Sequence, residues 1–189
     1  MRIWFPRLTK LSPTPISSLV KLTEEIGELS REIQRGDTTA AADELLDVAQ
    51  VCATLMFLVD PRNVCEAVAL HQRKLVDKGY LVAVDDSCGI WERDGDKVFS
   101  LPRLNIEPTL CGTMLKLSEE AGELAQVMGK FSNLNGERNA RTSDDRDFLL
   151  ALLDVVQTCV TMLYVMMDEE SAERMLVAHK EKLRDHGYL

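Results

Sequence analysis

Apolar residues recur at helical spacing over the first part of the chain. A stretch that follows Pro13 and Pro15 and ends at Gly36-Asp37 has leucine or isoleucine at five positions of one face: Leu19, Leu22, Ile26, Leu29 and Ile33. Intervals of three and four residues place these side chains on a single stripe of an α-helix, while most intervening positions are polar. The pattern predicts an amphipathic helix with one buried face.

Two further helices are expected after the first. The second runs from about residue 39 to 58 or 59 and is apolar on almost every side, so it is predicted to be largely buried. Asp60-Pro61 ends it, because proline cannot continue the helical hydrogen bonds. The third is expected over residues 63–78, with Gly79 as its C-terminal cap.

Three blocks of sequence occur twice, in the same order. Matched blocks of this kind indicate tandem duplication of one mainly helical unit. The pairs are KLTEEIGEL at residues 21–29 with KLSEEAGEL at 116–124, DVAQVCAT at 47–54 with DVVQTCVT at 154–161, and HQRKLVDKGYL at 71–81 with HKEKLRDHGYL at 179–189.

The duplication sets the expected domains: repeat 1 over residues 1–84, a linker over 85–104 and repeat 2 over 105–189. In the linker, Asp94-Gly95 predicts a short β-hairpin, because this dipeptide adopts the positive φ angles of a two-residue turn. Repeat 2 has a longer polar first loop over residues 132–146. Each unit is too small to bury three amphipathic helices alone. We therefore expect an all-α fold whose repeats pack as an intramolecular pseudo-dimer bundle.

Carboxylates interrupt the apolar pattern of repeat 1. On the second helix, Glu44 shares a face with apolar residues and Asp47 lies one turn further on. Glu25 and Glu28 lie beside the apolar stripe of the first helix. Buried carboxylates without partners are costly, so either raised pKa values neutralise them or a cation holds them. Oxygen ligands suit Mg²⁺ or Mn²⁺, and the lack of nearby His or Cys argues against zinc. The alternatives are a structural polar network and, for the first helix taken alone, a solvated charged face.

Charge and cysteine content narrow the classes of function. The formal net charge of −9 and the lack of an evident basic face argue against nucleic-acid binding, although metal ions can bridge an acidic protein to a polyphosphate. The five cysteines form no CxxC pair, which favours reduced thiols, with Cys52 and Cys159 in the core. The N-terminal residues lack the apolar core of a leader, and no window of about 18 uncharged apolar residues occurs. We therefore expect a cytoplasmic protein with no membrane partner.

Two short motifs suggest a family. Glu24-Glu25-Ile26-Gly27-Glu28 followed by Glu44-Leu45-Leu46-Asp47 resembles the signature of the MazG-like, all-α nucleoside triphosphate pyrophosphohydrolases. Their superfamily includes the dimeric dUTPases and the phosphoribosyl-ATP pyrophosphohydrolases. The resemblance covers both repeats. It implies Mg²⁺-dependent hydrolysis of a nucleoside triphosphate to the monophosphate and diphosphate, for nucleotide pool sanitation or balance, with Mn²⁺ as an alternative ion.

The resemblance also implies roles for individual residues. Glu24 and Glu25 would be catalytic, with Glu24 either a ligand or the residue that orients and deprotonates the attacking water. Phosphates would be bound by lysines, whose alternative role is that of solvated charges near helix ends. The implied metal ligands are Glu25, Glu28, Glu44 and Asp47, and the implied substrate-binding lysines are Lys21, Lys74 and Lys78.

Repeat 2 departs from the motif. Ala151 stands where repeat 1 has Glu44, and His186 stands where it has Lys78. Unless Asp147 substitutes, this predicts one competent site in repeat 1 and a structural role for repeat 2, with a further homodimer left open. The alternative function is a nucleotide sensor or helical scaffold that has lost turnover. The acids of the degenerate second site are Glu119, Glu120, Glu123 and Asp154.

The aromatic candidates for base stacking are Trp4, Phe5 and Trp91.

Overall fold

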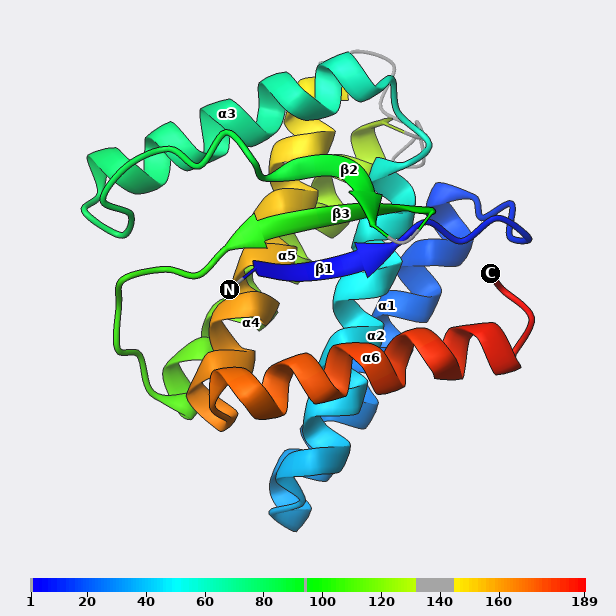
Figure 1. Ribbon diagram of the computed structural model, residues 1–189, viewed down its shortest axis with the longest axis vertical. Coiled ribbons are helices and arrows are strands. Elements are labelled where there is room, and N and C mark those ends of the chain that lie inside the picture. Colours follow the sequence, from blue (N-terminus) through cyan, green and yellow to red (C-terminus); the bar gives the residue numbers. More distant parts are fainter. Residues whose placement is uncertain (1, 94, 132–144) are drawn as a thin grey trace.

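The computed structural model describes residues 2–93, 95–131 and 145–189, and most of the expected polar loop over 132–146 lies outside them. The described chain is mostly helical, as predicted, with a small antiparallel sheet that contains the expected hairpin and one further strand (Figure 1). In chain order the elements are β1 (Arg2–Pro6), α1 (Pro15–Arg35), α2 (Thr38–Met56), α3 (Pro61–Asp77), β2 (Gly89–Arg93), β3 (Asp96–Pro102), α4 (Leu110–Phe131), α5 (Asp145–Met166) and α6 (Glu169–Asp185).

The ends of α1 follow from local sequence. Thr14 caps its N-terminus by accepting a hydrogen bond from the Ser17 backbone N–H at 3.1 Å, and the Ser17 hydroxyl accepts one from the Thr14 N–H at 2.9 Å. Pro15 then occupies the first turn, where no backbone donor is needed. Gly36, at φ 74°, ends the helix in a left-handed conformation that glycine adopts without steric cost.

The next two helices begin with aspartate caps. The Asp37 carboxylate accepts a hydrogen bond from the Ala40 N–H at 3.0 Å, so α2 starts almost directly after α1. Asp60 caps α3 in the same way, with Pro61 in the first turn. The expected ends of these helices are confirmed to within a few residues, which is the usual uncertainty of helix boundaries.

The sheet has the strand order β1-β3-β2. The predicted hairpin is confirmed in β2 and β3, where Arg93 pairs with Asp96; Asp94 of the turn lies outside the described residues, and Gly95 has φ 85°. Sequence reasoning did not predict β1, which pairs with β3 from Arg2 opposite Pro102 to Pro6 opposite Val98. A five-residue strand gains its stability from a partner far along the chain, which local patterns do not reveal.

Matched residues follow β1 and β3. The triplet Pro-Arg-Leu occurs at residues 6–8 and again at 102–104. The Gln50 side chain on α2 donates a hydrogen bond to the Pro6 carbonyl at 2.9 Å, and the Gln157 side chain on α5 donates one to the Pro102 carbonyl at 3.1 Å. The same contact therefore fixes a strand end in each half of the chain.

The third helix of each half packs on the other half. α1 lies against α2, α4 lies against α5, and α2 and α5 pack together at the centre. α3 packs against α5 and β2, whereas α6 packs against α2 and β1, so these two helices flank opposite edges of the sheet (Figure 1). This exchange decides which side chains meet at each site.

α2 and α5 supply most of the core. Cys52 and Cys159 are buried there, and all five cysteines are free, in agreement with the expectation of reduced thiols. By length and composition α5 is apolar enough to cross a membrane, yet 67 % of its most apolar window is buried inside the protein. The core helix of a soluble bundle has the same properties, so the length and composition of α5 are weak support for a membrane span.

Candidate functional site

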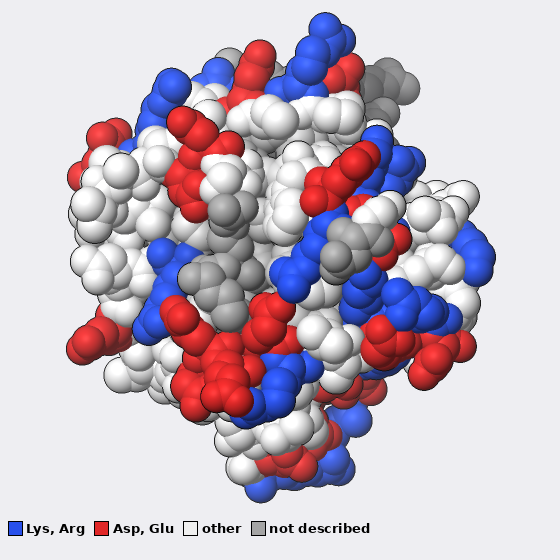
Figure 2. Space-filling view, viewed as in Figure 1, with Lys and Arg blue, Asp and Glu red and all other residues white. Residues whose placement is uncertain are grey.

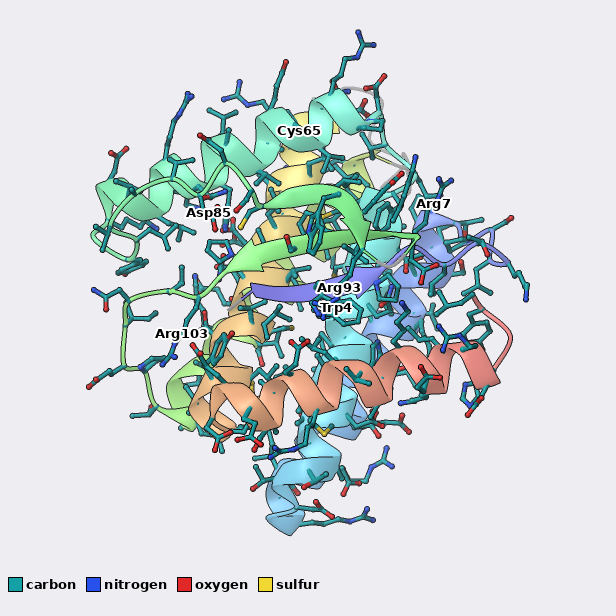
Figure 3. The ribbon with its side chains drawn as sticks, viewed as in Figure 1. Trp4, Arg7, Cys65, Asp85, Arg93 and Arg103 are labelled. Atoms are coloured by element: carbon teal, nitrogen blue, oxygen red, sulfur yellow. The ribbon has the colours of Figure 1, made fainter. Side chains whose placement is uncertain are left out.

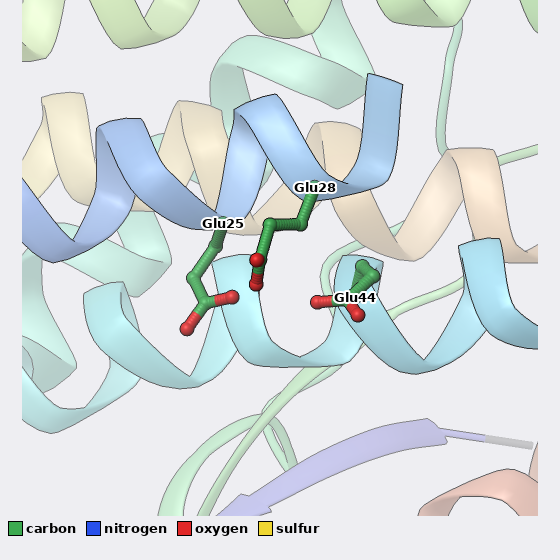
Figure 4. Close-up of side chains that lie close together, drawn as sticks. All are labelled: Glu25, Glu28 and Glu44. Carbon is green, nitrogen blue, oxygen red and sulfur yellow. The ribbon is translucent and has the colours of Figure 1, made fainter. Parts of the chain in front are cut away.

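Three carboxylates converge between α1 and α2 (Figure 4). Glu25 and Glu28 lie one turn apart on α1, and Glu44 faces them from α2; one oxygen of each lies within 4.8 Å of the other two. Within the described ranges, no second group of His, Cys, Asp or Glu side chains meets this criterion. Glu25, Glu28 and Glu44 are called the acidic cluster below.

The hairpin of α1 and α2 produces this convergence. Because the connection through Gly36 and Asp37 is short, the two helices run antiparallel as direct neighbours. Glu28 and Glu44 each lie about two turns from that connection, so they reach the same level along the helix pair. Their meeting is a consequence of loop length and helical periodicity.

Burial and mutual repulsion disfavour the ionised cluster. Glu25 is 4 % exposed, while Glu28 and Glu44 are half-buried. The pKa of Glu44 is raised to about 7, first by burial and then by the negative charges of Asp47 and the other cluster members. The pKa of Glu25 is also raised, because burial outweighs its hydrogen bond with Lys21. Three crowded carboxylates, with no sulfur or nitrogen ligand among them, fit a hard divalent cation such as Mg²⁺.

Lys21 lies at one side of the cluster. Its ammonium is 2.6 Å from the Glu25 carboxylate and 3.3 Å from that of Glu24. The Glu24 side chain is 55 % exposed, so it lies at the rim and outside the acidic cluster. Of the two predicted catalytic residues, only Glu25 is therefore buried among the other acids.

Asp47, the fourth predicted ligand, contacts the other half of the chain. Its Oδ2 is 2.5 Å from the Lys182 ammonium on α6, which is also 2.8 Å from Asp43 Oδ2. The pKa of Asp47 is raised by burial, against the opposing effect of the Lys182 hydrogen bond. The structure thus brings three of the four predicted ligands together and pairs the fourth with a lysine.

Lys182 and Asp43 were missed by sequence reasoning, although one signal was available. The matched third blocks make Lys182 the counterpart of Lys74. Lys74 and Lys78 were expected to serve the acids of their own half. The structure instead places the Lys74 ammonium 3.1 Å from Asp154, because α3 packs on α5, and Lys78 lines the same pocket.

A pocket of about 380 Å³ opens beside the acidic cluster, called the first pocket below. Its walls come from α1, α2, the segment between β1 and α1, and the end of α6. Both apolar side chains and a few polar groups line it, so it has the character of a small-molecule site. The lining includes Leu11, Ser17, Ser18, Lys21, Glu25, Asp47, Gln50, Thr54, Leu183 and Tyr188.

The corresponding place in the other half holds a second pocket of about 390 Å³. Lys116 is 2.5 Å from Glu120 and 3.1 Å from Glu119, repeating the arrangement around Lys21. Glu120, Glu123 and Asp154 all line this pocket. Ala151, which has no carboxylate, corresponds in the matched blocks to Glu44 of the first half.

The aromatic candidates for base stacking lie elsewhere. Trp4 and Phe5 are buried in the core, and the Arg93 guanidinium lies 4.5 Å from the centre of the Trp4 ring (Figure 3). The Trp91 indole donates a hydrogen bond to the Ser100 hydroxyl at 2.8 Å. None of these three lines the first pocket, whose described aromatic residue is Tyr188.

The surface charge is mixed. On the face shown in Figure 2, acidic and basic side chains are interspersed and form no continuous basic field.

Comparisons of this chain with protein-family models, with curated proteins and with solved structures found no match. The resemblance to the MazG-like pyrophosphohydrolases therefore rests on the motif residues themselves.

Proposed function

We propose that this chain is a Mg²⁺-dependent nucleoside triphosphate pyrophosphohydrolase, which converts a ribo- or deoxyribonucleoside triphosphate and water to the monophosphate and diphosphate. The acidic cluster would be its active centre. The observation that carries the proposal is the convergence of three partly or fully buried carboxylates beside a pocket of small-molecule size. A scaffold has little need for such a cluster, because it weakens the fold in the absence of a cation.

The donor set and the charges around it suit a triphosphate. When bound to Glu25, Glu28 and Glu44, Mg²⁺ or Mn²⁺ would neutralise the substrate and stabilise the charge that develops during phosphoryl transfer. Lys21 and Lys182 flank these carboxylates and can donate hydrogen bonds to phosphate oxygens. Asp47 holds Lys182 in that position.

Glu25 is the best-placed proton acceptor. A general base works best when its pKa lies near the operating pH, and burial raises the pKa of Glu25 in that direction. Hydrolysis joins the water oxygen to a phosphorus of the α–β bridge and breaks the bridging P–O bond, while the water proton passes to the carboxylate. Glu24, at the rim, would position Lys21.

We further propose that the two repeats form an intramolecular pseudo-dimer. Two reciprocal ion pairs support this: Lys182 of the second half with Asp47 of the first, and Lys74 of the first half with Asp154 of the second. Each candidate site then contains side chains from both halves, as when neighbouring subunits of a dimer line a shared pocket. The first half alone would lack Lys182.

A nucleotide sensor or scaffold is the second candidate. Two observations favour it: Lys21 and Lys182 already balance part of the acidic charge, and Ala151 removes a carboxylate from the second site. In that case the acids would form a structural network. The two functions differ in what the loss of Glu44 does to stability and turnover.

The test is Glu44→Gln in the full chain, with Glu123→Gln, which removes the charge of a carboxylate outside the acidic cluster, as the control. Diphosphate release is measured on a panel of ribo-, deoxyribo- and modified triphosphates with Mg²⁺, with Mn²⁺ and with EDTA. The hydrolase predicts metal-dependent release that Glu44→Gln abolishes, together with a higher melting temperature in EDTA because repulsion is relieved. A structural network predicts a lower melting temperature. Bound nucleotide without turnover in the wild type would favour the sensor.

A further inference from the structure

The second pocket differs from the first in charge. It lies between α3, α4 and α5, and three lysines and three carboxylates face it, so its lining charges cancel. These residues are Lys74, Lys78, Lys116, Glu120, Glu123 and Asp154.

Substitutions between the halves account for the difference. Aligned on Asp47 and Asp154, the acids Asp43 and Glu44 of the first half correspond to Leu150 and Ala151 of the second. In the third block, His186 at the first site corresponds to Lys78 at the second. All three differences make the second pocket more positive. An anion can enter it without a metal ion to offset a surplus of carboxylates.

The lysines of the second pocket can reach a ligand. Lys78 makes no ion pair with a carboxylate in the described part of the chain. Lys74 and Lys116 are paired with Asp154 and Glu120, but about half of each lysine side chain is exposed. Since an ammonium has three donors, each can keep its carboxylate and also donate to a phosphate oxygen.

Buried polar atoms that lack a hydrogen bond of good geometry point independently to a ligand. His71 lines the second pocket and is 1 % exposed; neither ring nitrogen makes a hydrogen bond of good geometry, although the Gln157 side chain lies within reach of the ring. Its Nδ1 lies 3.5 Å from Asp154, beyond a good hydrogen bond. Gln157 Oε1, in the same wall, also lacks a hydrogen bond of good geometry, and so do the equivalent Gln50 Oε1 and His179 ring nitrogens of the first half. Buried polar atoms without good hydrogen bonds are costly to the fold, so they suit a ligand with its own donors and acceptors.

We propose that the second pocket binds a nucleoside phosphate without a metal ion. Lys74, Lys78 and Lys116 bind the phosphates, and His71 and Gln157 bind polar groups of the sugar or base. The volume is too large for a phosphate alone, and the remaining lining includes the apolar side chains of Leu75, Leu104 and Ile106. This binding goes beyond hydrolysis at the acidic cluster and does not depend on it.

The experiment measures binding to the full chain by calorimetry in EDTA. The probes are the non-hydrolysable α,β-imido analogues of the four common deoxynucleoside triphosphates, and diphosphate alone. We expect one analogue bound per chain and at least tenfold weaker binding in Lys74→Ala/Lys78→Ala. The matched control is Lys182→Ala/His186→Ala, which alters the equivalent positions at the acidic cluster and is expected to retain the binding. Circular dichroism checks that both variants are folded, and Lys78→Arg is expected to bind like the wild type.

Three results would overturn the proposal: no analogue bound in EDTA, loss of binding in the control instead, or diphosphate binding as tightly as every analogue. The proposed hydrolase is tested separately, since it requires Mg²⁺ and Glu44. Diphosphate release without metal-free binding refutes only the second pocket. Metal-free binding without diphosphate release refutes only the hydrolase.

Discussion

The two pockets share a framework and differ in chemistry. Each lies beside a hairpin of two helices and receives a lysine from the third helix of the other half. Around the first, burial and then the neighbouring carboxylates raise the pKa of Glu44 to about 7. Around the second, Ala151 leaves a gap in the acidic set and Lys78 adds a positive charge. A few side chains on one backbone arrangement therefore separate a candidate metal centre from a candidate metal-free site.

The largest expected difference between the pockets is catalytic. Glu25→Gln is expected to lower diphosphate release by about 100-fold or more, because it removes both a ligand and the proton acceptor. Glu120→Gln, the same change in the second half, should have a far smaller effect. Steady-state kinetics with Mg²⁺ on both variants measures this, and equal losses would show that the two pockets are not functionally distinct.

The third helix of each half packs on the other half, and this packing predicts the second-largest effect, a loss of kcat/KM. Lys182→Ala is expected to reduce kcat/KM by about 10-fold or more, since hydrogen bonds to charged groups contribute about 1.5–3 kcal/mol. Lys74→Ala should reduce it much less, because Lys74 contacts Asp154 and not the acidic cluster. The reverse order, measured on the two purified variants, would contradict the assignment of Lys182 to the first site.

The pH dependence of the free energy of unfolding tests the difference in charge between the two pockets. In the folded protein the pKa of Glu44 is about 7, above its ordinary 4.5, so the stability lost by charging it is absent below pH 4.5, grows between pH 4.5 and 7, and is constant above 7. Glu44→Gln removes that penalty. Its gain over the wild type in EDTA should be small near pH 5 and reach about 1–2 kcal/mol by pH 8, allowing for solvent screening.

Urea unfolding at several pH values measures the gain. Two buried histidines, His71 and His179, also titrate, since burial lowers the pKa of each to about 4. Both are present in the two proteins, so their contribution cancels in the difference. A gain that shrinks as pH rises would contradict the assigned pKa shift.

The smallest effect should come from restoring the missing acid. Ala151→Glu is expected to lower the melting temperature in EDTA and to give a Mg²⁺-dependent rise in melting temperature that exceeds that of the wild type. About 1 kcal/mol corresponds to roughly 2–4 °C for a chain of this size. Ala151→Gln is the isosteric control and should show no extra response to Mg²⁺. Identical Mg²⁺ responses in both would mean that Ala151 is not what separates the pockets.

Much of the helical fold could be predicted from local sequence. Pro15, Gly36 and Asp60 set helix ends through backbone geometry and capping, which depend on neighbouring residues alone. The convergence of Glu25, Glu28 and Glu44 also followed, because helical periodicity and one short connection bring them together. Strand β1 could not be predicted, since its partner β3 lies more than ninety residues away.

The sequence by itself predicted the helices that the described residues form, three matched sequence blocks, and which acids of the first half lie on facing helical surfaces. Only the tertiary structure decided which lysines meet which acids. Lys74 and Lys182 occupy matched positions in the blocks 71–81 and 179–189. The sequence of one half cannot show whether its third helix packs on the same half or on the other one. That choice depends on long-range burial of apolar faces, and it placed Lys182 beside Asp47 and Lys74 beside Asp154.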